Sequence, residues 1–113
     1  MELLILIIHD AQQMDEILVK MMEAGIRGGT LLDCKGVLQA VAGTDLEKPP
    51  VFSSLRQYLN PDADTNKLLL AAMTAENIEK THNIVTDVTG GLQKANTGVF
   101  LTLPLGYTDG VRG

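Results

Sequence analysis

The sequence predicts an α+β fold of the ferredoxin-like βαββαβ type, in which two helices cover one face of an antiparallel sheet. The first observation is a repeated order: an apolar run, an amphipathic helical stretch and a second apolar run occur twice along the chain. The second is the length of 113 residues, which suits a single domain with one core. Two strand–helix–strand units in one small domain are the pattern of the split βαβ fold.

The first unit comprises a strand at Leu3–Ile8, a helix at Met14–Ala24 and a strand at Thr30–Leu38. Asp10 before the helix suits an N-cap, and Gln13 three residues later completes a capping-box pattern. Gly25 suits the left-handed position at which a helix ends. We expect the methionines of this helix to fill the core rather than to bind a ligand.

The second unit repeats this order at Leu68–Met73, Ile78–Val88 and Val99–Leu105. Thr74 is a suitable N-cap, and Glu76 falls in the first turn, where the helix dipole favours a negative charge. Gly90 and Gly91 follow the helix and are expected to end it. The whole chain, residues 1–113, is therefore expected to form one domain.

A long connection, residues 39–66, joins the two units. A structureless connection of this length is unusual inside a compact domain, so we expect local order in it. Phe52, Leu55 and Leu59 fall on one helical stripe, which predicts a short helix within Val51–Leu59. The residues before it suggest a hairpin extension at Val37–Ala42.

The first and last predicted strands are apolar at nearly every position. A sheet that helices cover on one face normally alternates apolar and polar residues. Leu3–Ile8 and Val99–Leu105 do not alternate, so both faces of the sheet must be covered. The sequence shows no further helices for the second face, and we expect another copy of the same chain to cover it.

Composition and charge exclude several classes of protein. The net charge is −5 and no block of basic residues occurs, which argues against nucleic-acid binding. The longest apolar run, Leu3–Ile8, is too short to span a bilayer, and the N-terminus lacks the basic leader of a secretory signal. Cys34 is the only cysteine, so an internal disulfide is excluded and a reducing cytoplasm is the expected compartment.

Catalytic and metal-binding motifs do not occur in the sequence. It contains no P-loop, no Gly-x-Ser-x-Gly, no His-Glu-x-x-His and no Cys-x-x-Cys, so we do not expect an enzyme. His9, Cys34 and His82 could ligate a metal, but their spacing matches no known ligand pattern. We therefore expect no metal site.

Two glycine-containing segments are the candidate binding elements. One runs from Gly28 to Gly36, and the other is Asn96-Thr97-Gly98, directly before the last strand. Glycine loops at strand ends can direct several backbone N–H groups toward one anion, and Lys94 could add positive charge. The residues alone favour the simpler interpretation that these glycines shape turns.

At these two segments the chain resembles the PII-like signalling proteins. Residues 24–36, AGIRGGTLLDCKG, resemble the PII passage from helix to strand, with its Gly-x-Thr and later Lys-Gly. Residues 96–105, NTGVFLTLPL, resemble the PII B-loop and the final strand that closes on proline. The opening strand, the first helix and the length of the central insertion also agree, so the resemblance covers nearly the whole chain.

The resemblance implies a non-enzymatic signalling protein of the type of the nitrogen regulatory protein PII, which is a homotrimer that binds ATP or ADP in clefts between subunits. The residues matched to the base and ribose side are Thr30, Gly36, Val37 and Leu38, with Gln39 following them. The residues matched to the phosphate side are Asn96, Thr97 and Gly98. The nucleotide would be an effector rather than a tightly bound cofactor.

Residues 39–66 correspond to the T-loop, through which such proteins contact a partner such as an enzyme or a transporter. Effector binding would order this segment and change what it contacts. The candidates for partner contact are Phe52, Leu55, Arg56 and Tyr58. Packing of Phe52 and Leu55 onto the body is an equally open interpretation.

The chain departs from the PII pattern at three places. Typical PII proteins carry Gly-Asp-Gly-Lys in the B-loop, whereas Thr97-Gly98-Val99 ends without a lysine. The C-loop arginines are absent apart from Arg112, and Tyr58 does not match the tyrosine that the T-loop presents for modification. These departures indicate a divergent member in which uridylylation is not expected.

Three other functions stay open. A metal-binding trimer like those of the CutA family, which share the architecture, would need His9, Cys34 and His82 to converge. A small dimeric enzyme would hold a histidine or an acid on the open sheet face, which is apolar here. A trimeric scaffold without an effector is the last alternative.

Overall fold

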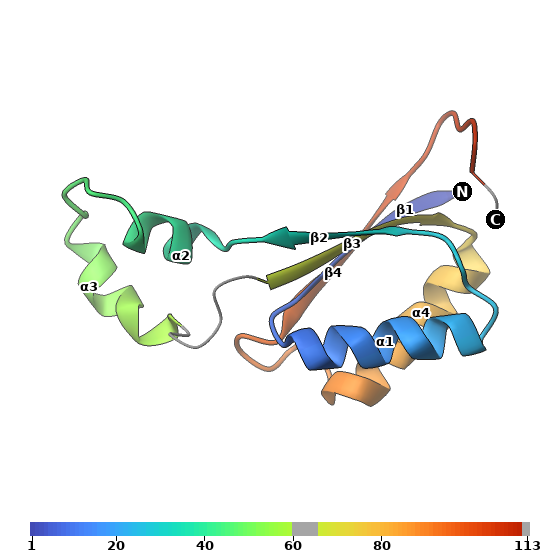
Figure 1. Cartoon of the computed structure of the whole chain (residues 1–113), viewed down its shortest axis with the longest axis horizontal. Coiled ribbons are helices and arrows are strands. Elements are labelled where there is room, and N and C mark those ends of the chain that lie inside the picture. The colour runs from blue at the N-terminus through green and yellow to red at the C-terminus, as the bar shows by residue number, and fades with distance from the viewer. Residues whose placement is uncertain (60–65, 112–113) are drawn as a thin grey trace.

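The computed structural model describes residues 1–59 and 66–111 and has the predicted ferredoxin-like α+β fold. Its elements are β1 (Glu2–Ile8), α1 (Ala11–Glu23), β2 (Thr30–Cys34), α2 (Val37–Ala42), α3 (Val51–Leu55), the 3₁₀ turn η1 (Arg56–Tyr58), β3 (Asn66–Met73), α4 (Ala75–Thr89) and β4 (Gly98–Pro104). The strands form one sheet in the order β2-β3-β1-β4, and all neighbouring pairs are antiparallel. Figure 1 shows α1 and α4 together on one face of this sheet.

The start and end of α1 follow the local sequence. The carboxylate of Asp10 accepts hydrogen bonds from the backbone N–H groups of Gln12 (2.9 Å) and Gln13 (3.2 Å). Gly25, directly after the C-cap, has a φ of +85°, which a residue with a Cβ rarely adopts. Met21 is buried, but the prediction that every methionine of this helix fills the core was wrong for Met22. That side chain is 67% exposed, because it lies one helical step off the buried stripe.

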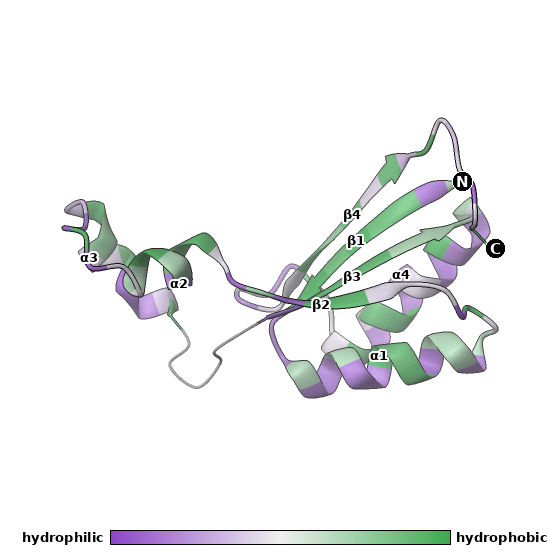
Figure 2. Ribbon diagram, turned by 45° about the horizontal axis from the view of Figure 1, so that its top comes forward, coloured by the Kyte–Doolittle hydropathy of each residue, from purple (hydrophilic) through white to green (hydrophobic). Residues whose placement is uncertain are grey.

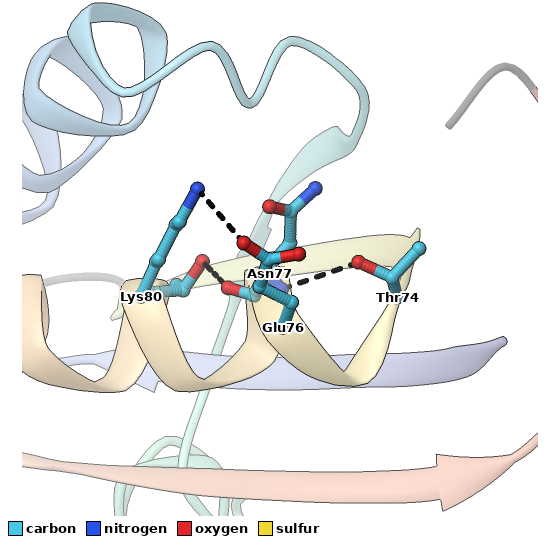
Figure 3. A network of polar contacts seen from close by, with 5 residues as sticks. Thr74, Glu76, Asn77 and Lys80 are labelled. Atoms are coloured by element: carbon cyan, nitrogen blue, oxygen red, sulfur yellow. Dashed lines mark hydrogen bonds and ion pairs between the residues drawn. The ribbon is translucent and has the colours of Figure 1, made fainter.

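Helix α4 begins and ends as the sequence predicts. The hydroxyl of Thr74 accepts a hydrogen bond from the Asn77 N–H (3.2 Å), and Glu76 pairs with Lys80 one turn later (3.5 Å; Figure 3). Gly90 ends the helix with a φ of +80°. Within the described residues, no helix is long and apolar enough to cross a membrane.

The core lies between the two long helices and the sheet. In β1, Leu4, Leu6 and Ile8 are fully buried against the helices. The members of the buried cluster are Leu4, Leu6, Ile8, Met14, Ile17, Met21, Ile26, Leu69, Ala71, Met73 and Val85. Since successive side chains of a strand alternate between faces, the residues between these point to the other side of the sheet.

The other side of the sheet, which we call the open face, is apolar as well. In the register of the sheet Ile5 pairs with Leu70 on one side and with Leu101 on the other. Helices α1 and α4 both lie on the opposite face, and Figure 2 shows hydrophobic colouring along much of β1 and β3. The apolar residues of the open face are Leu3, Ile5, Ile7, Leu32, Leu68, Leu70, Ala72, Val99, Leu101 and Leu103. Because Leu101 and Leu103 are 51% and 50% exposed, this chain alone leaves the face in contact with water.

Residues 35–59, which we call the arm, project away from the sheet (Figure 1). The predicted hairpin at Val37–Ala42 was wrong, because these residues form α2, and strand β2 ends at Cys34 rather than at Leu38. Gly36 is the N-cap of α2, and the last pair between β2 and β3 among the described residues joins Cys34 to Asn66. Helix α3 and η1 lie within the stretch predicted to be helical, and no residue of the arm joins the buried core.

Candidate functional site

One end of the sheet collects most of the predicted site residues. The pairs Ile8–Gly98 and Cys34–Asn66 place the ends of β1 and β2 beside the starts of β4 and β3. We call this the arm end, because the arm leaves the sheet here, directly after Cys34. It is formed by loops and strand termini, where the backbone is free of sheet pairing and can present groups to a ligand.

The first group of predicted residues lies at the root of the arm. Gly36 has extended backbone and caps α2, and its C=O accepts a hydrogen bond from the Ala40 N–H (3.0 Å). Val37, Leu38 and Gln39 form the first turn of α2 instead of continuing the strand. Val37 is 82% exposed, whereas Leu38 and Gln39 are half-buried. A ligand that contacts these residues would therefore contact the arm itself.

The second group lies in the turn before β4. Asn96 has a φ of +61°, a left-handed conformation that asparagine tolerates better than most residues. The C=O of Thr97 accepts a hydrogen bond from the backbone N–H of His9 (3.1 Å). Gly98 opens β4 so close to β1 that an added Cβ would lie 2.2 Å from the carbonyl oxygen of Ile7. The tight pairing of β1 and β4 thus requires glycine at position 98.

The structure brings these two groups to the same end but not into contact within one chain. They belong to the two edge strands, and β3 and β1 lie between them, which corresponds to about 14 Å across three strand spacings. Thr30 starts β2 and lies at the opposite end of the sheet from Gly36, about 20 Å away along the strand. The predicted effector residues are therefore not a single cluster in this chain.

Two further residues lie between these groups at the arm end: Asn66, which the sequence analysis missed, and His9, which it considered only as a metal ligand. Asn66 starts β3, and its side-chain amide nitrogen lies 4.0 Å from the position that a Cβ of Gly36 would take. His9 follows Ile8, which pairs with Lys67 and Gly98, and its backbone N–H donates a hydrogen bond to the C=O of Thr97 (3.1 Å). Asn66, His9 and Thr97 form a polar row from the root of the arm to the turn before β4. The position of Asn66 directly at a strand end is the sequence signal that could have indicated it.

Lys94 and Lys67 are both held away from this row. The ammonium group of Lys94 lies 2.7 Å from the position of a Cβ on Gly90, at the C-terminus of α4, where the helix dipole favours a cation. Lys67 pairs with Asp33 on the helix side of the sheet. The hydrogen bond with Asp33 is the main reason why the pKa of Lys67 is raised. Partial loss of hydration lowers this pKa, whereas the charges of Asp33 and Asp15 raise it further. Arg112 lies outside the described residues.

The three potential metal ligands are divided between the two sides of the sheet. Cys34 lies on the open face, level with Asn66, whereas the ring of His82 packs edge-on against Phe100 on the helix side, with ring centres 5.0 Å apart. Burial and, to a smaller extent, the charge of Asp33 raise the pKa of the Cys34 thiol, which disfavours the thiolate that binds metals. Among the described residues no group of three or more His, Cys, Asp or Glu side chains could hold a metal ion.

Comparison with known proteins identifies the fold. No family model matches the sequence, and no curated protein matches it. Among solved structures, the crystal structure of Arabidopsis thaliana PII bound to citrate is similar, with a TM-score of 0.61 and 12% sequence identity. The similarity covers 92% of this chain and 76% of that chain. At this identity the likeness concerns the fold, and the chain has a PII-like fold.

Proposed function

We propose that this protein is a non-enzymatic PII-like regulator that binds a small effector, an adenine nucleotide such as ATP or ADP, and relays its presence to a partner protein. The observation that carries the proposal is the position of Gly36: it lies at the arm end and is also the N-cap of α2 in the arm. An effector held between Gly36 and the turn at Asn96–Gly98 would contact both the body and the arm. Such an effector shifts the arm toward the arrangement that it binds best.

The polar row of Asn66, His9 and Thr97 suits the part of the effector that would lie between Gly36 and the turn at Asn96–Gly98. Asn66 offers a carboxamide, which can both donate and accept hydrogen bonds with the edge of a purine base. His9 offers an imidazole beside the backbone of Thr97. Lys94 lies at the C-terminus of α4 and Lys67 is paired with Asp33, so phosphate binding would use the backbone N–H groups of the turn at Asn96–Gly98 rather than either of these lysines.

The proposal includes a homotrimer with effector sites between subunits. Two observations support the need for a second copy. The open face is apolar, and burying it would remove side chains such as Leu101 from water. In addition, Thr30 lies at the opposite end of the sheet from Gly36, so a site that includes both requires residues of two chains.

The arm is proposed as the contact to the partner protein, such as an enzyme or a transporter. Leu55 and Tyr58 are 39% and 51% exposed, and none of the arm's residues belongs to the core. Arg56 lies beside them in η1. An exposed aromatic side chain next to an arginine is the composition of residues that dominate protein interfaces. A cytoplasmic location belongs to this proposal.

The solved PII structure with a similar fold contains citrate, which supports small-molecule binding in general. The CutA-like alternative finds less support, because His82 lies on the other side of the sheet from Cys34. A scaffold without an effector is the remaining alternative, and titration with nucleotides distinguishes it from the proposed regulator.

Calorimetric titration with ATP, ADP and AMP, with and without magnesium, tests the proposal. The variant must avoid Gly98, where any side chain would break the β1–β4 pairing. Asn96→Asp is suitable, because aspartate has nearly the same shape, tolerates positive φ and places a negative charge where phosphates are proposed to bind. Asn83→Asp makes the same chemical change on the exposed surface of α4 and serves as the control.

We expect saturable binding of ATP or ADP to the wild type and to Asn83→Asp, and binding weakened about tenfold or more in Asn96→Asp, as expected for an added like charge at a phosphate. Light scattering on the same samples verifies that the oligomeric state is unchanged. Absence of heat with every nucleotide would overturn the adenine nucleotide as effector and favour the scaffold.

A further inference from the structure

A pocket lies on the helix side of the sheet, at the end of β2 remote from the arm. It is a pocket of about 200 Å³ between the C-terminal half of α1 and the start of β2. The lining residues are Leu18, Met21, Met22, Ile26, Arg27, Gly28, Gly29, Leu31 and Leu69. None of them belongs to the proposed effector site, so this inference is independent of the proposed function.

The pocket exists because the two helices of this chain leave the edge strand β2 partly uncovered. Helices α1 and α4 pack over the inner strands, whereas β2 lies at the edge and is bonded to β3 alone. Leu31 points to the helix side, level with the buried Leu69, and yet is 42% exposed. On the opposite wall Met22 is 67% exposed. Large apolar side chains thus border a hollow that nothing in the described chain fills.

The floor of the pocket is shaped by Gly29. A Cβ at this residue would lie 3.0 Å from Leu69 Cδ1 and 3.3 Å from Ala71 Cβ, and its φ of +143° also disfavours a side chain. The chain can therefore run close over β3 and leave the space beside it open. Glycine at this position therefore allows both the turn and the open space of the pocket.

The rim of the pocket carries a positive charge. The ion pairs among the described residues are Lys67–Asp33 and Lys80–Glu76, so the exposed guanidinium of Arg27 has no acidic partner there. The backbone N–H of Gly28 also donates no hydrogen bond to a group of the described chain. A guanidinium next to a backbone N–H is a common way of binding a carboxylate.

We propose that this pocket binds a small amphiphilic carboxylate, with its hydrocarbon part between Met22 and Leu31 and its carboxylate at Arg27. At about 30 Å³ for a group the size of a water molecule, the volume holds about six or seven carbon atoms. A free medium-chain fatty acid has this size and chemistry. The bound chain covers the apolar walls, and the charged head stays at the rim.

Octanoate below its micelle concentration is the probe, and 1-octanol is its uncharged counterpart. The protein is labelled with ¹³C at the methionine methyl groups, since Met21 and Met22 line the pocket while Met1 and Met73 do not. We expect octanoate to shift the signals of Met21 and Met22 saturably and to leave those of Met1 and Met73 in place. Absence of a saturable shift at Met22 overturns the proposal.

Two variants separate the apolar part from the charged part. Leu31→Ala removes a wall of the pocket, and Leu32→Ala is its matched control, because Leu32 is 44% exposed on the open face. We expect weaker octanoate binding in Leu31→Ala and unchanged binding in Leu32→Ala. Equal losses in both variants would overturn the assignment of the site.

Arg27→Gln tests the contact with the carboxylate head group. Because Arg27 is exposed, we expect this variant to fold normally, so it tests the proposal even if Leu31→Ala folds poorly. We expect this variant to bind octanoate about tenfold more weakly, the usual effect of losing a charged hydrogen-bond partner, and to bind 1-octanol as before. Unchanged octanoate affinity overturns the role of Arg27. Shifts of Met22 that depend on protein concentration without any octanoate would show instead that a second copy occupies the pocket.

Discussion

Gly98 lies directly against the backbone of Ile7. A Cβ on Gly98 would stand 2.2 Å from the Ile7 carbonyl oxygen and 3.0 Å from Ile8 Cδ1. Glycine is therefore required here by the pairing of β4 with β1, whatever ligand the neighbouring turn binds. In this chain the glycine before the last strand has a structural role that is separate from any binding role.

The first prediction follows from this contact. Gly98→Ala is expected to lower the free energy of unfolding by about 1–3 kcal/mol, because the new methyl group must push the two strands apart. Gly106→Ala is the control, since a Cβ there meets no atom within 4 Å. Urea denaturation followed by circular dichroism measures both. Equal stabilities of the two variants would contradict the close approach of β4 to β1.

The second prediction concerns the open face. Leu101→Glu places a charge in the middle of this apolar surface and is expected to dissociate the proposed trimer, because burying an unpaired charge costs several kcal/mol. Val19→Glu makes the same type of change on α1 at a similar exposure, 56% against 51%, and is expected to leave the assembly intact. Sedimentation velocity distinguishes the species. A wild-type protein that sediments as a monomer would refute the assembly altogether.

The third prediction concerns the pair formed by Lys67 and Asp33. The folded-state pKa of Lys67 is raised above its ordinary value of 10.5, first by the hydrogen bond with Asp33. A raised pKa contributes stability that is present below the unfolded-state pKa and is lost as the pH rises through the folded-state value. The contribution is therefore complete at neutral pH and disappears only in the alkaline range above 10.5.

An NMR titration of the Lys67 side chain tests this direction. Asp33→Asn removes the charged partner and is expected to lower the pKa of Lys67 toward that of an isolated lysine. Asp45→Asn, in the arm, is expected to leave it unchanged. If Lys67 titrates identically in the wild type and in Asp33→Asn, the pair does not persist in solution.

The fourth prediction is that the arm contributes little to the stability of the body. Leu55→Ala is expected to change the free energy of unfolding by less than about 0.5 kcal/mol, because no arm residue belongs to the core. Leu6→Ala removes a fully buried side chain of β1 and is expected to cost about 2–5 kcal/mol. Thermal unfolding of the two variants gives the comparison. A large loss for Leu55→Ala would mean that the arm packs on the body or on another copy.

The elements of the body could be predicted because their signals are local. Asp10 and Thr74 cap the two long helices, and Gly25 and Gly90 end them in left-handed conformations. Each of these depends on residues within one turn, so the sequence pattern suffices to find it. The boundaries of the strands shifted by only a few residues, apart from the early end of β2 at Cys34.

The arm shows where local patterns fail. The apolar residues of Val37–Ala42 fit both a strand and a helix, and the hairpin was predicted from them wrongly. What decides between the two is tertiary pairing, and the described pairs of β2 with β3 run from Thr30–Leu70 to Cys34–Asn66, before this segment begins. Pairing between residues far apart in sequence was therefore the missing information.

By itself the sequence determined the fold class, the two long helices and the apolar character of both faces of the sheet, because periodicity, caps and glycines act over a few neighbouring residues. Only the tertiary structure decided which residues meet. The strand order β2-β3-β1-β4 separates Gly36 from Asn96–Gly98, inserts His9 and Asn66 between them, and sends Thr30 to the far end. The physical reason is that strand order and register join distant segments through backbone hydrogen bonds, which no local pattern of side chains specifies.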